Sequence, residues 1–119
     1  MEQKDIISRK DIEYLVDTFY GRVKVDPLLA PQFSHVDWNK HLPVMYNFWS
    51  SMMLGEQSYR GNPFEKHLPL PLTTAHFTAW ITLFLEVVDL NFSGTQADEI
   101  KMRAQSIAQV FQHKMNLIK

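Results

Sequence analysis

The sequence predicts an all-α fold, because four separate stretches carry apolar residues at the spacing of an amphipathic helix. Glycine and proline gather between these stretches and mark their ends. No stretch shows the alternation of apolar and polar residues that is typical of a half-buried strand. The chain has 119 residues, the length of one domain with one core, and we expect residues 1–119 to form that domain.

The first predicted helix covers residues 11–25. Ser8 followed by Asp11 is typical of a helix start. Asp26 and Pro27 indicate the end, because a proline disfavours helical geometry in the residue before it. The apolar residues fall at i, i+3, i+4, i+7, i+8 and i+11, which places them in one stripe along the helix. This stripe consists of Ile12, Leu15, Val16, Phe19, Tyr20 and Val23.

A second helix is predicted over residues 38–54, after short turns in the proline-containing residues 26–36 whose apolar side chains point inwards. Asp37 is the expected N-cap, and Gly55 marks the end. Pro43 cannot donate the backbone N–H that a helix requires, so the regular helix either begins close to Pro43 or bends there. The apolar face is broad and contains Trp38, His41, Leu42, Met45, Phe48, Trp49, Met52 and Met53.

The next stretch, residues 55–72, is rich in glycine and proline and predicts a long connection with at most one short helix at residues 64–68. A connection of this length in so short a chain is usually functional.

Two further helices follow this connection. The third is capped by Thr73 or Thr74 and ends before Ser93, and the fourth begins at Thr95, with Asp98 three residues later. The third carries Phe77, Trp80, Ile81, Phe84, Leu85 and Val88 on one face, and the fourth carries Ile100, Ala104, Ile107, Ala108, Phe111 and Met115.

Composition excludes several classes of function. The net charge is −1 with both signs interspersed, which is unlike a nucleic-acid-binding protein. The chain has no cysteine, so disulfides, thiolate metal sites and covalent cofactor attachment through Cys-x-x-Cys-His are excluded. The sequence has no apolar run of signal-peptide or membrane-spanning type, and we therefore expect no membrane association and a cytoplasmic protein.

The five histidines are the natural candidates for metal chemistry in a chain without cysteine. No pair has the i, i+4 spacing of a helical zinc clamp, so a metal cage made of protein side chains alone is poorly supported. A haem requires fewer protein ligands than such a cage, namely one imidazole and an aromatic slot. His67 lies in a brief turn between proline-rich segments and could provide that imidazole, although an exposed loop histidine is equally compatible. Tyr20 and Trp80 could add polar hydrogens to such a slot, or be ordinary core aromatics.

Four separated motifs agree in order and spacing over most of the chain. They are Phe19-Tyr20 with Val23; Trp38-x-x-His41 leading to Asn47-Phe48-Trp49 and Met53-Leu54-Gly55-Glu56; Lys66-His67-Leu68-x-Leu70-Pro71; and Phe77-x-x-Trp80. Together they resemble the truncated haemoglobins, specifically group III, from about Lys10 to Met115. The absence of a Gly-Gly pair agrees with that group.

The resemblance implies a truncated globin-like two-over-two helical sandwich with haem b, iron protoporphyrin IX, between the helix pairs. It implies His67 as the proximal iron ligand. Tyr20 and Trp80 would donate hydrogen bonds to a bound ligand on the distal side, and His41 would stand at the pocket mouth as a possible gate. The remaining cofactor-binding positions would be Phe19, Phe33, Met45, Phe48, Trp49 and Phe64.

Three functions stay open at this point. The favoured one is a non-covalent haem protein that binds dioxygen, nitric oxide or both, with carbon monoxide as a further diatomic ligand. The second is a haem enzyme, a nitric oxide dioxygenase or a peroxidase, with a reductase as partner. The third is a haem-free helical sensor or ligand-binding module that uses the same pocket.

Other polar residues are less informative. His76 lies one turn before Trp80, where a position near solvent at the helix start is favoured over an approach to the cofactor. His35 and His113 are expected at the surface. Candidates to pair with the haem propionates are Arg22, Lys24, Arg60, Lys66 and Arg103.

Overall fold

A computed structural model of the chain describes residues 3–34, 36–55 and 72–115. In chain order it contains α1 (Arg9–Val23), the short 3-10 helix η1 (Ala30–Phe33), α2 (Trp38–Leu54), α4 (Thr74–Asn91) and α5 (Thr95–Lys114). No described residue lies in a strand, and the predicted all-α fold is confirmed. The short helix predicted at residues 64–68 lies outside the described residues.

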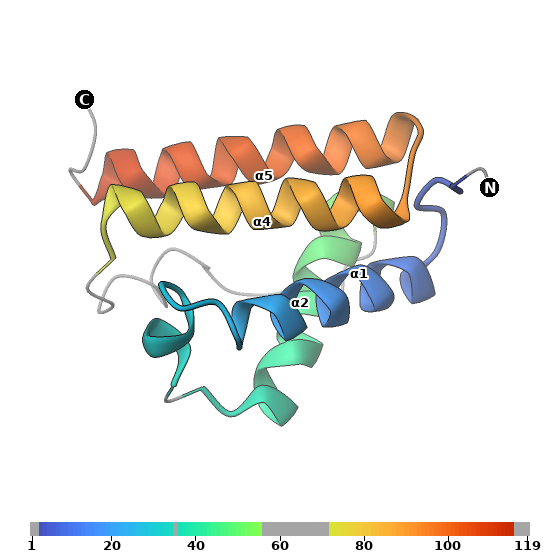
Figure 1. Cartoon of the computed structure of the whole chain (residues 1–119). Coiled ribbons are helices and arrows are strands. Elements are labelled where there is room, and N and C mark those ends of the chain that lie inside the picture. The colour runs from blue at the N-terminus through green and yellow to red at the C-terminus, as the bar shows by residue number, and fades with distance from the viewer. Residues whose placement is uncertain (1–2, 35, 56–71, 116–119) are drawn as a thin grey trace.

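The helices form two pairs, one above the other. In Figure 1, α4 and α5 run side by side in opposite directions, and α1 and α2 lie below them. The helix α1 contacts both α2 and α4, so it connects the two layers. This arrangement agrees with the predicted two-over-two sandwich.

The helix α1 follows the sequence prediction closely. It begins at Arg9, slightly earlier than predicted, because Ser8 and Asp11 form a reciprocal capping box: the Asp11 N–H donates to Ser8 Oγ at 3.4 Å and the Ser8 N–H to Asp11 Oδ2 at 3.2 Å. Every residue of the predicted apolar stripe is buried. The stripe therefore provides one whole side of the core.

The helix α2 begins at Trp38, so the alternative of a start close to Pro43 is wrong. Asp37 explains the earlier start. Its side chain accepts the Asn39 N–H at 3.1 Å, and its carbonyl accepts the His41 N–H at 2.9 Å. None of these first-turn bonds needs the N–H that Pro43 lacks, so the helix can begin before the proline. Gly55 ends the helix in the left-handed conformation, with φ of 73°.

The helix α5 begins at Thr95 as predicted, but its cap comes from far away in the sequence. The Asp5 carboxylate accepts the N–H groups of Gln96 at 2.9 Å and Ala97 at 2.8 Å. The preceding residue, Gly94, has φ of 132°, and a Cβ atom there would lie 2.6 Å from Asp5 Cγ. A glycine at this position is what allows the carboxylate to reach the end of the helix.

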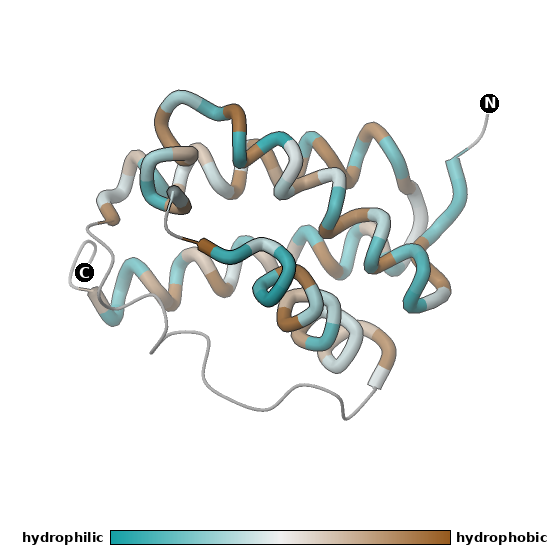
Figure 2. The backbone as a smooth tube through the Cα atoms, turned by 90° about the horizontal axis from the view of Figure 1, so that it is seen from below, coloured by the Kyte–Doolittle hydropathy of each residue, from teal (hydrophilic) through white to brown (hydrophobic). Residues whose placement is uncertain are grey.

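The core lies between the two layers and is rich in aromatic rings. Hydrophobic and hydrophilic segments alternate along the helices in Figure 2, as expected when each helix turns one side inwards. Phe84 is central, because its ring stacks on Trp80 at 5.6 Å and on Trp49 at 5.2 Å between ring centroids. Phe19 closes the cluster with edge contacts to Phe84 and Trp80.

Candidate functional site

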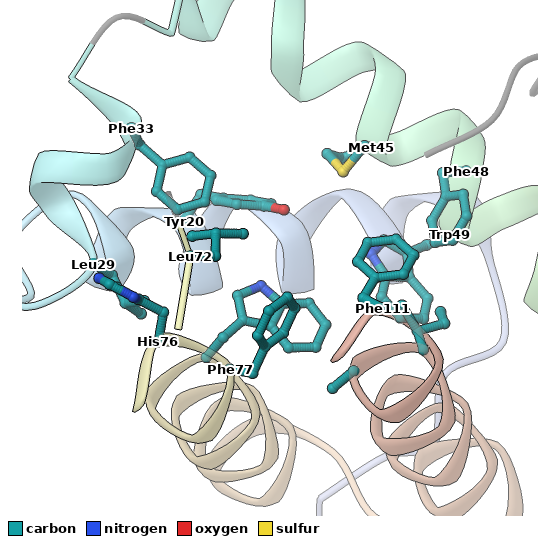
Figure 3. A pocket seen from close by; sticks show the side chains of 13 residues that line it. Tyr20, Leu29, Phe33, Met45, Phe48, Trp49, Leu72, His76, Phe77 and Phe111 are labelled. Atoms are coloured by element: carbon teal, nitrogen blue, oxygen red, sulfur yellow. The ribbon is translucent and has the colours of Figure 1, made fainter. Parts of the chain in front are cut away.

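An apolar cavity lies between the two layers. Its walls come from all the described helices. Figure 3 shows Phe33 and Tyr20 on one side and Phe48, Trp49 and Phe111 on the other. The lining residues are Tyr20, Leu29, Phe33, Met45, Phe48, Trp49, Leu72, His76, Phe77, Trp80, Ile107, Ala108 and Phe111. Most of them are apolar, so the cavity suits a largely apolar ligand.

Helical spacing explains why these side chains meet. On α2, Met45 precedes Phe48 and Trp49 by three and four residues, and on α4, Phe77 precedes Trp80 by three. Residues at these separations lie on the same side of a helix. The apolar stripes seen in the sequence are therefore partly core and partly cavity wall.

The Tyr20 hydroxyl and the Trp80 indole form a polar pair in this apolar wall. The indole N–H donates to the phenol oxygen, since an indole has no acceptor. Burial raises the pKa of Tyr20 well above its ordinary value, and the Trp80 hydrogen bond opposes only part of that rise. The phenol therefore stays protonated, and no acceptor for its hydrogen is found in the part of the chain that the structure describes. The pair can donate one hydrogen bond to a ligand in the cavity.

Three rings from two other elements hold the Tyr20 ring in place. Trp38, Phe33 and His41 lie at centroid distances of 5.2, 6.2 and 5.6 Å from it. The Trp38 ring in turn carries the Lys24 Nζ atom 4.7 Å above its centroid. Such surroundings leave the phenol little rotational freedom, which is what a preorganised donor requires.

His76 also lines the cavity, at the first turn of α4. The side chain is half-buried, and its Nδ1 atom accepts the Thr73 N–H at 3.0 Å. The Thr73 hydroxyl lies 2.9 Å from the same nitrogen. This contact closes a capping box, so the imidazole is fixed by the helix start that it stabilises.

The structure brings together most of the residues predicted for the site. Six of them line the one cavity: Tyr20, Phe33, Met45, Phe48, Trp49 and Trp80. Phe19 and His41 do not line it. Phe19 packs behind Tyr20 and Trp80, and His41 lies edge-on against Tyr20 and Trp38 with its Nε2 atom shielded from solvent. Phe64 and His67 lie outside the described residues.

The sequence favours a position near solvent at the helix start for His76; the structure places it in the first turn of α4, half-buried in the cavity wall. Two signals in the sequence could have indicated this position. His76 precedes Trp80 by four residues and so shares its side of the helix, and it follows Thr73 by three residues, the spacing of a capping box.

The cations suggested for the propionates have other partners where they are described. Arg22 pairs with Glu86 at 3.0 Å, and Arg103 pairs with Glu99 at 2.9 Å. Lys24 lies over the Trp38 ring. Arg60 and Lys66 lie outside the described residues, as does His35. His113 is exposed, as expected.

Within residues 3–34, 36–55 and 72–115, no cluster of three or more His, Cys, Asp and Glu side chains could hold a metal ion. No helix among the same residues is long and apolar enough to cross a membrane.

Comparison with known proteins places the chain among known relatives over nearly its whole length. The family model for bacterial-like globins matches residues 5–116. The group 3 truncated hemoglobin ctb of Campylobacter jejuni is 34% identical over 118 residues, covering 93% of this chain and 93% of that protein.

Two solved structures have the same fold. The crystal structure of the group III truncated hemoglobin from Campylobacter jejuni matches with a TM-score of 0.88 at 34% identity, covering 96% of this chain and 95% of that one. The X-ray structure of the truncated oxygen-avid haemoglobin from Bacillus subtilis matches with a TM-score of 0.79 at 28% identity, covering 88% of this chain and 93% of that one.

Proposed function

The chain belongs to the bacterial-like globins as a truncated haemoglobin of group III, and on that basis we propose that it binds dioxygen in the described cavity, beside a haem b that His67 holds. Globin-type binding of a haem ligand is common to the family. The choice of dioxygen, the ligation by His67 and the distal role of Tyr20 and Trp80 belong to this proposal. The observation that carries it is the Tyr20–Trp80 hydrogen-bonded pair in an otherwise apolar cavity.

The residues present fit a haem. A porphyrin is a flat apolar ring system with two carboxylates at one edge, and it needs aromatic walls and few polar groups. Phe48, Trp49, Phe77 and Phe111 provide such walls. When bound, the haem supplies the iron that coordinates a diatomic gas. The chain supplies the apolar enclosure and the hydrogen-bond donor.

The Tyr20–Trp80 pair favours a ligand that accumulates negative charge, and dioxygen does so more than carbon monoxide. The Trp80 N–H polarises the phenol, which makes the Tyr20 O–H a stronger donor. A charged or polarised acceptor gains more from such a donor in an apolar site than it would in water. The Bacillus subtilis relative that this chain resembles is named as oxygen-avid, which supports the same choice.

His67 is preferred to His76 as the iron ligand because of the proton on the His76 ring. The Thr73 N–H can only donate, so His76 Nδ1 must be the acceptor. The proton of the neutral imidazole then sits on Nε2, and a protonated nitrogen cannot donate a lone pair to iron. A ligating histidine has the opposite arrangement, with its second ring nitrogen donating.

The test compares wild-type protein, His67→Gly and His76→Gln after reconstitution with haemin. We expect a sharp Soret band and a ferrous iron–histidine stretching band in wild type and in His76→Gln. In His67→Gly both should be lost and then restored by added imidazole. A stretching band that survives in His67→Gly without imidazole contradicts the ligand assignment. A wild-type protein that takes up no haemin contradicts the proposed function and favours a haem-free binding module.

A further inference from the structure

His76 occupies an edge of the cavity that the proposed gas chemistry does not use. In Figure 3 its side chain lies beside Leu29, and Tyr20 and Phe33 line the same side of the cavity. Trp49, which also carries an N–H, is 3% exposed, whereas the His76 side chain is half-buried. His76 is therefore a polar group at the boundary between the apolar cavity and water.

The capping contact determines what His76 can offer to a ligand. Because Nδ1 accepts from the Thr73 backbone, the ring proton is fixed on Nε2. Among the described residues, Nε2 makes no hydrogen bond. The capping box thus leaves an N–H donor at a fixed position in the wall of the cavity. Such an N–H can donate to an acceptor on the ligand, but it has no free lone pair with which to coordinate a metal.

The acceptor that fits is a carboxylate. An apolar ring system that enters this cavity must leave its charged groups near water, because a buried unpaired carboxylate is costly. Of the cations suggested by the sequence that the structure describes, Arg22 and Arg103 pair with Glu86 and Glu99, and Lys24 lies over the Trp38 ring. His76 is half-buried, which allows an acceptor to contact both the imidazole and solvent.

We propose that the His76 Nε2–H binds a propionate carboxylate of the porphyrin, so that the residue capping α4 also anchors the cofactor. This inference rests on the proposed function, since it requires a haem in the cavity. It links the start of α4, and with it Phe77 and Trp80, to the occupied state of the pocket.

Two substitutions separate the donor from the cap. Glutamate and glutamine at the third residue of a helix both accept a capping hydrogen bond, so each keeps the contact to Thr73. His76→Gln retains an N–H donor, whereas His76→Glu replaces the donor by a negative charge. Thr78→Glu, at an exposed position on the same helix, is the matched control for the added charge. Thermal unfolding of the three apoproteins checks that the cap survives.

The measurement is the rate of haem loss to an excess of apomyoglobin. We expect His76→Glu to lose haem about tenfold faster than wild type, the size of one hydrogen bond to a charged group. His76→Gln and Thr78→Glu should stay within about threefold of wild type, less than such a bond contributes. With haemin dimethyl ester, which has no carboxylates, the difference between His76→Glu and wild type should disappear.

Three outcomes overturn the inference. Equal rates of haem loss in His76→Glu and wild type show that His76 Nε2 makes no hydrogen bond to a propionate. A difference that persists with the dimethyl ester shows that the effect does not pass through the carboxylates. Equal losses in His76→Gln and His76→Glu show a role for the ring itself and not for its donor. In each case haem still binds, so the proposed function stands; a wild-type protein without haem overturns both.

Discussion

The most direct consequence of the pocket concerns the Tyr20 hydroxyl, which Tyr20→Phe removes while keeping the ring. The ring contacts with Trp38, Phe33 and His41 do not involve the hydroxyl, so the fold should be retained. The substitution also releases the Trp80 N–H from its acceptor. The ligand therefore loses one donor and gains access to a second, weaker one.

The magnitude follows from these two changes. A hydrogen bond to a charged acceptor contributes about 1.5–3 kcal/mol, which corresponds to about 10- to 150-fold in a dissociation rate. Because the freed Trp80 N–H replaces part of this bond, we expect the lower end, about tenfold faster release of dioxygen from Tyr20→Phe. Tyr20→Phe combined with Trp80→Phe removes both donors and should reach the upper part of the range. The two effects should not add, because the two groups share a hydrogen bond.

The assay is stopped-flow release of dioxygen from the reduced, haem-loaded protein, with carbon monoxide as the trap. Carbon monoxide dissociation, measured in parallel, should change less than dioxygen dissociation in both variants because this ligand is less polar. The control is Tyr14→Phe, which removes a hydroxyl from an exposed tyrosine of the same helix. Burial raises the pKa of Tyr20, so the wild-type rate should not vary from neutral to moderately alkaline pH. Unchanged dioxygen release in Tyr20→Phe and in the double variant would refute the distal assignment.

Other predictions concern the framework that holds the pocket. Asp5→Ala removes the carboxylate that accepts two N–H groups of α5, and we expect the free energy of unfolding, from urea titration, to fall by about 1.5–3 kcal/mol. Desolvation alone would raise the pKa of Asp5, but backbone N–H donors outweigh it and the pKa lies below its ordinary value. This stabilisation is therefore complete above the unfolded pKa of about 3.9, and the difference from Asp5→Ala should vanish as the pH falls through the lower folded pKa. Gly94→Ala combines a positive φ with a clash against Asp5 and should destabilise by about 1–3 kcal/mol in the same titration. Phe84→Ala should cost about 3–5 kcal/mol and reduce the near-ultraviolet circular dichroism of the tryptophans stacked on it; an unchanged spectrum would contradict the stacking.

Local patterns in the sequence were sufficient to predict all four long helices, but not the start of α2. The stripe of α1 and its Ser8–Asp11 start could be read directly, because both depend on residues within a few positions of one another. The start of α2 could not be decided, because the effect of Pro43 depends on whether the earlier turn has its own cap. Asp37 supplies that cap, and only the geometry shows that its bonds are made.

Long-range contacts were beyond any local pattern. The cap of α5 by Asp5 joins residues 91 and 92 positions apart, and nothing near Thr95 indicates it. Most of the cavity-lining residues named in advance came from the resemblance to the truncated haemoglobins, because a family resemblance carries tertiary information that helical periodicity does not. The resemblance also implied Phe19 as a cavity-wall residue, but Phe19 is buried behind the residues that line the cavity. Spacing alone cannot distinguish two layers of inward-pointing rings.

The capping of α5 by Asp5 has a consequence for the order in which the molecule folds. Gln3 Nε2 donates to the Leu90 carbonyl at 2.7 Å, and the Ser93 N–H donates to the Lys4 carbonyl at 3.0 Å. Residues 3–5, the N-terminal strap, are therefore bound to the end of α4 and to the connection between α4 and α5. These bonds close a loop that contains most of the chain. The entropy lost in closing so large a loop is offset only when the intervening helices are already packed. The strap should therefore form last and open first. Its amides should exchange with deuterium ahead of the α4–α5 core, and a fusion partner that displaces residues 3–5 should speed unfolding while leaving the folding rate nearly unchanged.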